Sequence, residues 1–416
     1  MGQTKPGKIL VAKFGGSSLA SSDRISKAAL SVANEVKKGS KVAVVVSAMG
    51  KSTDQLLEIV KGAIKLERQT LSDLDDIVSM GERTSARIFC TALKANGVNS
   101  RYFDPMDEDW PLITDDAYGN AKPLLNESFE RIKKYVSPLL ERKMVPVIPG
   151  FIGKTPSGKI TTIGRGGSDT TAFILAQALG ADEVILVTDV PGIMTGDPKL
   201  IKNPRPLKFM PVQSLAGLAD SGAKFIHKKA LKYKPAEIDV KVLSYEHGRL
   251  DAEGTIIEGG LTNEITVDLS LKPTLMITIV GDGVSEEPSI LKEIIEEIRK
   301  REIDLAGMSA DYNSLIFYLP SKKLNGLLDS IHEIVKTHER ALAMAVKKDL
   351  ALIQVSGVGL EETPGTVERI SGPLCRHNIN IYGMFTITSS VNVLVEWSDK
   401  EKALNLIKNS LKEGEN

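Results

Sequence analysis

Apolar and polar positions alternate along the first 260 residues in a strand–helix–strand order, which is typical of a mainly parallel sheet covered by helices. Ile9–Phe14 and Lys41–Ser47 are short apolar runs that predict buried strands. Thr170–Leu179 is apolar on nearly every face and predicts a buried helix. We expect a long helix over 73–96 and further strands at 145–149, 160–163, 184–188 and 238–243.

Beyond residue 272 the pattern repeats with an offset of 76 residues. Three glycines, a proline and several apolar positions of the segment 281–336 recur at the same places in 357–412. Each copy runs strand, helix, two strands, helix, so we expect two copies of one supersecondary unit. The first copy gains a fourth strand at Arg340–Val346, whereas the second ends one strand short. The strand-like segment Glu264–Leu271 is therefore expected to complete the second unit, so that the first is inserted within it.

Composition narrows the class of protein. The chain has 416 residues, and its 53 Lys+Arg balance 53 Asp+Glu, which argues against general binding to nucleic acids or to anionic membranes. Cys90 and Cys375 cannot form a disulfide framework. The polar start of the chain shows no signal peptide, and no apolar run reaches the ~18 residues of a membrane span. We expect a cytoplasmic protein that binds neither nucleic acid nor membrane.

The first candidate site follows the first strand, at 13–18 (KFGGSS). Gly15 and Gly16 let backbone N–H groups approach an anion, and Lys13 supplies a full positive charge. A plain strand-to-helix turn explains the same residues equally well, so this motif alone leaves both interpretations open.

The second candidate site, 164–171 (GRGGSDTT), again follows a strand and opens the buried helix. Its glycines expose backbone amides and leave the Arg165 guanidinium free to hold a carboxylate or a phosphate. Asp169 could simply cap the helix, or it could orient lysines that face phosphates.

Other motifs are weaker. The loop 188–199 follows a strand end, where open α/β sheets hold ligands. The segment 153–159 (GKTPSGK) has P-loop spacing but precedes a strand, so we reject it. Glu82 lies within a helical pattern, where a solvated charge is the default. Two glycine-rich anion loops and a lysine, without a nucleophile or metal-ligand motif, together favour phosphoryl transfer.

These motifs resemble those of the aspartokinases, a branch of the amino-acid kinase family with two C-terminal ACT domains. The resemblance covers essentially the whole chain and includes VSAMGKSTD (46–54), SMGERTSA (79–86), GFIGKTPSGKITTIGRGGSDTTA (150–172), TDVPGIMTGDPK (188–199) and SGAKFIH (221–227). It implies an α/β amino-acid-kinase fold over 1–262, followed by two ferredoxin-like βαββαβ ACT domains. The first ACT domain would occupy 273–349, and the second would combine 263–272 with 350–416.

The resemblance further implies ATP-dependent phosphorylation of the side-chain carboxylate of L-aspartate to 4-phospho-L-aspartate, the first step towards lysine, threonine and methionine. ATP would enter with Mg²⁺, for which the sequence holds no ligand cluster of its own. Feedback control by lysine or threonine through the ACT domains, and a homodimer formed by them, are implied as well.

The same resemblance implies roles for individual residues. The expected catalytic residues are Lys13, Arg165 and Asp169. Aspartate would contact Ser47, Thr53, Glu82, Arg165 and Ser168. ATP would contact Lys13, Gly15, Gly16, Ser17, Thr188, Asp189, Met194, Asp197, Lys199 and Lys224. An effector would contact Thr388, Ser389 and Ser390.

Two alternatives stay open. Met194 stands where the family usually has an aromatic residue, and Lys228 where proline is usual, so the same fold could phosphorylate another small amino-acid-like substrate. A non-catalytic amino-acid sensor or regulatory subunit is the other alternative. It is disfavoured because the phosphate-facing residues are all present.

Overall fold

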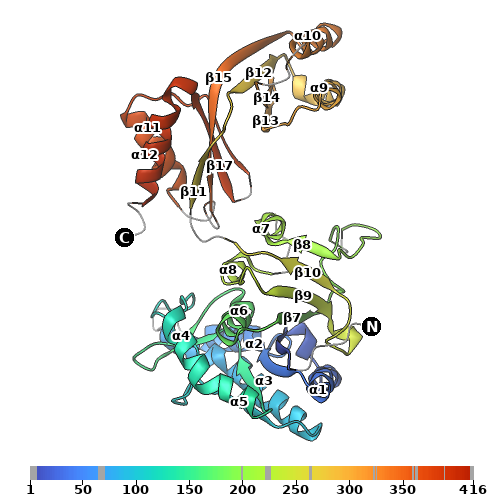
Figure 1. The fold of residues 1–416 in the computed structure, drawn as a ribbon, viewed down its shortest axis with the longest axis vertical. Coiled ribbons are helices and arrows are strands. Elements are labelled where there is room, and N and C mark those ends of the chain that lie inside the picture. The colour runs from blue at the N-terminus through green and yellow to red at the C-terminus, as the bar shows by residue number, and fades with distance from the viewer. Residues whose placement is uncertain are drawn as a thin grey trace. The chain divides into compact units, whose positions relative to one another are not determined.

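The structure, a computed structural model, describes residues 7–63, 71–197, 200–220, 226–261, 265–321, 324, 326–357, 360, 364–387 and 389–412. The chain divides into two compact units, Met1–Thr262 and Asn263–Asn416 (Figure 1). None of the described helices is both long enough and apolar enough to cross a membrane.

Within the described part of the first unit, eight strands form one sheet in the order β3-β4-β2-β1-β7-β9-β10-β8. All neighbours from β3 to β9 are parallel, β10 runs antiparallel to β9, and β8 runs parallel to β10, so these last two strands oppose the other six. The predicted, mainly parallel sheet is thus confirmed. The strands are β1 (Ile9–Phe14), β2 (Lys41–Val46), β3 (Ser100–Tyr102), β4 (Val145–Pro149), β7 (Glu183–Thr188), β8 (Phe209–Pro211), β9 (Asp239–Ser244) and β10 (Thr255–Glu258).

Helices cover both faces of this sheet. Successive side chains of a strand point to opposite faces, and because both faces are apolar, each is buried under helices. On β1, Val11 joins one apolar core, whereas Leu10 and Phe14 join the other. The first core is completed from α4 (Leu125–Arg131), α5 (Ser137–Glu141), α6 (Gly167–Leu179), α7 (Val212–Asp220) and α8 (Lys228–Leu231), and the second from α1 (Ser22–Lys37) and α3 (Leu71–Ala95).

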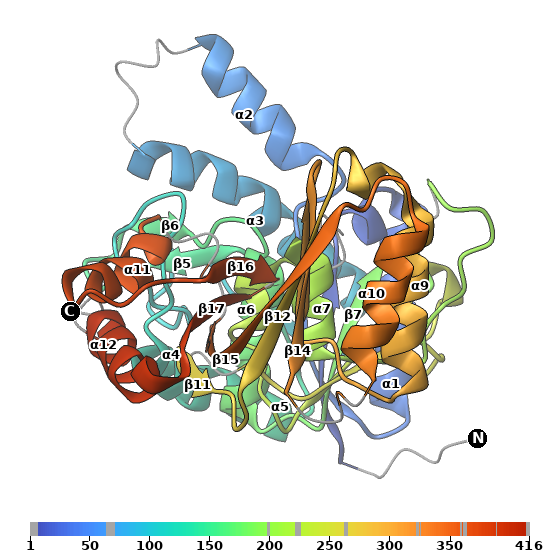
Figure 2. The ribbon, with the colours of Figure 1, turned by 90° about the horizontal axis from the view of Figure 1, so that it is seen from above.

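Two smaller elements matter for the site. Helix α2 (Ser52–Ala63) packs on α3 (Figure 2). Strands β5 (Ile152–Lys154) and β6 (Ile160–Thr162) form an antiparallel hairpin that leads into the second glycine-rich loop.

In the second unit, the described strands form one sheet in the order β13-β14-β12-β15-β17-β16, with β11 also paired to β15. Helices α9 and α10 lie side by side, as do α11 and α12 (Figure 2). The elements are β11 (Thr266–Leu269), β12 (Thr274–Val280), α9 (Pro288–Lys300), β13 (Gly307–Asp311), β14 (Ser314–Pro320), α10 (Leu327–Thr337), β15 (Ala343–Ser356), α11 (Thr366–Arg376), β16 (Gly383–Ile387), β17 (Ser390–Glu396) and α12 (Lys400–Lys412).

Strand β15 differs from its predicted form. The sequence pattern stopped this strand at Val346, because the polar residues 347–349 interrupt its apolar alternation. In the structure, β15 instead runs through these residues to Ser356 and has a total length of 14 residues. Its first half pairs with β12, and its second half pairs with β17 and β11. The register shifts where Asp349 has a φ of +60°, so the polar residues occupy a bulge in a continuous strand.

The repeated glycines are not equivalent in packing. A Cβ on Gly281 would lie 1.7 Å from the Arg340 carbonyl oxygen, a backbone atom. At the corresponding Gly357, the nearest atom would be Cγ1 of Ile265 at 3.2 Å, which belongs to a side chain. The first copy therefore requires glycine at this place more strictly than the second.

We predict that Gly281→Ala lowers the stability of the second unit by about 3 kcal/mol, because the backbone must move to admit the methyl group. Gly357→Ala is the matched control and should cost less than about 1 kcal/mol, since side chains can yield. Calorimetric unfolding of the full-length variants measures both. Equal losses in the two variants would contradict this account of the repeat.

Candidate active site

The loops that carry the sequence motifs leave the sheet from one edge. Phe14 at the end of β1 is paired in parallel with Val46 of β2 and with Val187 of β7. The carboxyl ends of these strands therefore lie together, as expected for ligand sites of open α/β sheets. A cleft of about 360 Å³ opens here. It is lined by Lys13, Gly16, Ser47, Ala48, Gly50, Lys51, Thr53, Asp54, Glu82, Phe151 and the loop 164–169.

An ion pair joins the two glycine-rich motifs. The Lys13 Nζ lies 2.7 Å from Oδ1 of Asp169, and the two side chains are 16% and 11% exposed. Lys13 comes from β1 and Asp169 from the first turn of α6. The pair places a cation at the positive end of a helix dipole, where an entering anion meets both.

The first loop packs tightly against the loop after β2. The Gly50 N–H donates to the Gly16 carbonyl oxygen at 2.9 Å, and a Cβ on Gly16 would lie 2.8 Å from the Ala48 carbonyl oxygen. Glycine is thus needed at 16 for a close backbone approach. The Gly15 N–H donates to the Val187 carbonyl oxygen at 3.1 Å. This N–H group, which was expected to bind a phosphate, is therefore already used in a hydrogen bond within the protein. The contacts expected of Gly16 and Ser17 stay predictions.

Arg165 is exposed at the rim of the cleft. It lies between Gly164 (φ +82°) and Gly166 (φ +74°), and a Cβ on Gly166 would lie 2.7 Å from His227 Cβ. Within the described residues, the Arg165 guanidinium has no ion-pair partner. The loop therefore presents a cationic fork that can receive a carboxylate or a phosphate. Ser168, in the first turn of α6, lines the same cleft.

Glu82 differs from the solvated charge that its spacing favoured. It is only 5% exposed, because Gly81 lets α3 approach Ala48 so closely that a Cβ there would lie 2.9 Å from Ala48 Cβ. Burial raises the pKa of Glu82 to about 7, although backbone hydrogen bonds from Ala48 and from Glu82 itself oppose the shift. Its Oε2 atom has no hydrogen-bond partner among the described residues. Glu82 is thus a buried acid that faces a ligand cleft.

All five expected substrate-side residues line the cleft, and so do Lys13 and Gly16 of the expected nucleotide contacts. Thr188 ends β7 and donates a hydrogen bond to Oδ1 of Asp189 at 3.1 Å. Met194 and Asp197 follow in the next loop, outside the cleft lining. Lys199, Lys224 and Thr388 lie outside the described residues.

The expected effector residues belong to the second unit. The Ser390 hydroxyl donates to the Ile387 carbonyl oxygen at 2.8 Å. The Ser389 hydroxyl oxygen is buried without a partner in the described part of the chain.

Sequence reasoning missed Lys51, Asp54 and Phe151, which also line the cleft. Phe151 has a φ of +69°, and a Cβ on Gly167 would lie 2.9 Å from its ring. A positive φ at a non-glycine residue leaves no mark in a hydrophobic pattern. Lys51 and Asp54 did lie within the recognised segment 46–54, but as exposed charges they resemble any surface pair.

Lys228, where a proline was expected, begins α8 and is buried. The preceding His227 caps the helix, because its side chain accepts a hydrogen bond from the Lys229 N–H at 3.3 Å. The capping histidine is also the residue that packs against Gly166.

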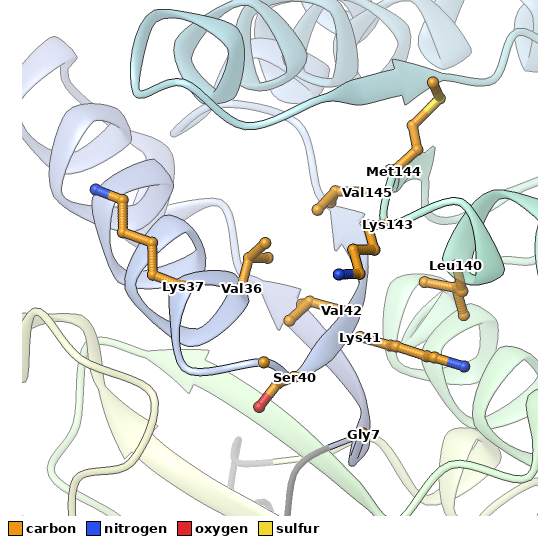
Figure 3. A pocket seen from close by; sticks show the side chains of 11 residues that line it. Gly7, Val36, Lys37, Ser40, Lys41, Val42, Leu140, Lys143, Met144 and Val145 are labelled. Carbon is orange, nitrogen blue, oxygen red and sulfur yellow. The ribbon is translucent and has the colours of Figure 1, made fainter.

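A second cavity, of about 350 Å³, lies at the opposite edge of the sheet (Figure 3). Lys41 begins β2, Val145 begins β4, and Gly7 precedes β1, so the cavity lies at the amino ends of these parallel strands. None of the phosphate-loop or acidic residues described above lines it. Among the residues that the structure describes, no group of three or more His, Cys, Asp or Glu residues could hold a metal ion.

Comparison with known proteins gives the family. The model of the amino acid kinase family matches residues 8–244. An aspartokinase of Thermus thermophilus is 30% identical over 410 residues, which cover 96% of this chain and 97% of the relative. This chain belongs to the amino acid kinase family. Aspartokinase 2 of Bacillus subtilis is 29% identical over a similar length, so the resemblance to the aspartokinase branch is confirmed.

Solved structures show the same fold. The aspartate kinase of Synechocystis has a TM-score of 0.76 at 24% identity, covering 96% of this chain and 69% of that one. Escherichia coli aspartokinase III, in complex with aspartate and ADP, has a TM-score of 0.54 at 24% identity and covers 97% of this chain. The expected amino-acid-kinase fold is therefore confirmed.

The buried acid of this amino acid kinase makes stability depend on pH. The pKa of Glu82 is about 7 in the folded protein and near 4.5 in an unfolded chain, so folding favours its protonated form. Relative to Glu82→Gln, the natural protein should lose about 3 kcal/mol of stability as the pH rises from about 4 to 8. Urea unfolding across this range measures the difference.

Ser168→Ala, a cleft residue without a titratable group, is the control and should keep a constant stability difference from the natural protein. A difference between the natural protein and Glu82→Gln that does not change with pH would contradict the burial of this acid.

Proposed function

We propose that the chain transfers the γ-phosphoryl group of ATP to the side-chain carboxylate of L-aspartate, which gives 4-phospho-L-aspartate and ADP. The observation that carries this proposal is the charge arrangement of one cleft. It presents an exposed guanidinium, a buried acid with one oxygen that no described residue contacts by a hydrogen bond, and a lysine paired to an aspartate. An amino acid with two carboxylates and one ammonium group complements these charges. The curated relatives named aspartokinase support the choice.

On the substrate side, the ionised Glu82 would receive the ammonium group, and Arg165 would hold a carboxylate by a two-fold hydrogen bond. The hydroxyl groups of Ser47, Thr53 and Ser168 would orient the molecule. Binding two charged groups at once fixes the acceptor carboxylate for in-line attack, and such positioning is, with charge stabilisation, what phosphoryl-transfer catalysis consists of.

On the nucleotide side, Lys13 would neutralise charge on the phosphoryl group in transit, and Asp169 would hold that lysine in place. The start of α6 adds its positive dipole end. MgATP is the phosphoryl donor, and Gly15, Gly16, Ser17 and the loop after β7 would surround its phosphates. The N–H donors would come from Gly16 and Ser17, because the Gly15 N–H is held by the Val187 carbonyl oxygen. Thr188, Asp189, Met194, Asp197, Lys199 and Lys224 complete the proposed nucleotide contacts.

The product is a mixed anhydride, which a reductive step can convert further. We place the reaction at the start of lysine and threonine biosynthesis, in the cytoplasm.

Regulation would reside in the second unit. The proposed domains are a kinase over 1–262, a first ACT domain over 273–349 and a second formed by 263–272 with 350–416. The antiparallel pairing of β11 with the second half of β15 supports this division. A solved relative, aspartokinase III of Escherichia coli, is in complex with lysine and aspartate. Lysine or threonine is accordingly our proposed effector, with Thr388, Ser389 and Ser390 as contacts and a homodimer as the assembly.

Single substitutions separate the two sides of the cleft. We predict that Lys13→Ala lowers kcat about 100- to 1000-fold, since a transition-state charge loses its partner. Arg165→Ala should raise the KM for aspartate about 100-fold, because a charge-assisted bidentate contact is lost. The aspartate-dependent hydroxamate assay with ATP and Mg²⁺ measures both.

Lys51→Ala removes another cation of the same cleft and should change either constant less than about threefold. No acyl phosphate from the natural protein would refute the proposed function. A panel of amino acids scored by ADP release tests the alternative substrate. Thermal stabilisation by lysine or threonine without any by ATP would favour the sensor.

A further inference from the structure

Asp75 is a buried carboxylate that the proposed reaction does not use. It lies on α3, two helical turns before Glu82 and thus on the same side of the helix. Its side chain is almost fully enclosed, with only 2% of the residue exposed. A buried carboxylate is costly unless hydrogen bonds or cations compensate it, so its partners indicate why it is there.

The partners of Asp75 come from the segment around Gly119 and from the end of β6, and all are uncharged. Its Oδ2 accepts the Gly119 N–H at 2.9 Å and the Thr162 N–H at 2.8 Å. Its Oδ1 accepts the Thr162 hydroxyl group at 2.7 Å. Asp75 forms no ion pair within the described part of the chain. The carboxylate therefore ties α3 to these two segments and to nothing of opposite charge.

Both segments support the loop 164–166, which carries Arg165 and is called the arginine loop below. Thr162 ends β6, three positions before Arg165. The Ala121 N–H donates to the Thr162 carbonyl oxygen at 2.9 Å. A Cβ on Gly164 would lie 2.9 Å from Oδ1 of Asn120, so the segment around 119–121 packs directly against the start of the loop.

A cation holds the same segments from another helix. The Lys229 Nζ, on α8, donates to Oδ1 of Asn120 at 2.6 Å and to the Ile163 carbonyl oxygen. Desolvation lowers the pKa of Lys229, in keeping with its half-buried place. The base of the arginine loop is thus fixed by an acid from α3 and a base from α8.

We propose that Asp75 is a positioning residue that holds Arg165 in its place relative to Glu82. One rigid helix carries both Asp75 and Glu82, so the tie to Thr162 fixes the cationic side of the cleft against the acidic side. This inference rests on the proposed function, in which Glu82 and Arg165 together hold aspartate. Asp75 then controls the affinity for aspartate without touching it, and leaves ATP binding and phosphoryl transfer unchanged.

Asp75→Ala tests the proposal, because it leaves the buried Thr162 N–H and the half-buried Gly119 N–H without their acceptor. The KM for aspartate should rise about tenfold or more, while kcat stays within about threefold and the KM for ATP within about twofold. Asp75→Asn should restore the KM for aspartate to within about threefold of the natural protein. Its amide oxygen can accept both N–H groups, and its NH₂ group can donate to the Thr162 hydroxyl oxygen.

Two further variants keep the test decisive. Thr162→Val removes only the hydroxyl contact and should raise the KM for aspartate about threefold, even if Asp75→Ala fails to fold. Glu35→Ala is the matched control, since Glu35 is a buried carboxylate on α1, which accepts a hydrogen bond from Lys38 Nζ at 2.6 Å. It should lower the melting temperature without changing the KM for aspartate.

Hydrogen exchange separates a failure of this inference from a failure of the proposed function. Peptides covering 162–169 should exchange faster in Asp75→Ala, but not in Asp75→Asn or Glu35→Ala. A natural protein that makes no acyl phosphate would refute the proposed function, and the exchange pattern would then decide the role of Asp75 alone. Unchanged exchange, or equal increases in KM for aspartate and ATP, would overturn the inference.

Discussion

The ion pair between Lys13 and Asp169 is the interaction on which the rest of the cleft depends. It joins the end of β1 to the first turn of α6, two elements far apart in the sequence. The parallel order of β2, β1 and β7 brings their carboxyl ends to one edge, and glycine at 16 lets the neighbouring loops close around it. The pair thus fixes a positive charge where the strand end, the helix dipole and the glycine-rich loops meet.

Charge in this protein matters locally. The chain as a whole is neutral, with 53 basic and 53 acidic residues, but a positive and a negative side chain occupy different places in its cleft. Arg165 faces solvent on a loop of positive-φ glycines, whereas Glu82 is enclosed by α3 and the loop after β2. An exposed cation can recruit an anionic ligand, and a buried acid gains most when a cation arrives to compensate it. Small charged substrates therefore suit this cleft better than a polyanion.

Much of the fold follows from sequence, because buried parallel strands such as β1 and β2 are nearly continuous apolar runs and most of α6 is apolar on nearly every face. The two glycine-rich motifs could also be found from sequence, because each is a contiguous run of residues that follows a predicted strand. The hydrophobic pattern predicted neither the burial of Glu82 nor the full length of β15. The burial of Glu82 depends on the distant contact between Gly81 and Ala48, and β15 continues through polar residues because two other strands supply its partners. Asp75 likewise shows its role only once Gly119 and Thr162 are folded around it.

The central claim is that one cleft recognises both charges of an amino acid, and succinate tests it most directly, because it is aspartate without the ammonium group. The ratio of kcat/KM for aspartate to that for succinate should be measured at about pH 8.5, above the pKa of about 7 of Glu82, in the natural protein and in Glu82→Gln. We predict that the substitution lowers this ratio about tenfold or more, by weakening aspartate and leaving succinate nearly unchanged. A ratio that is the same in both proteins would contradict the claim.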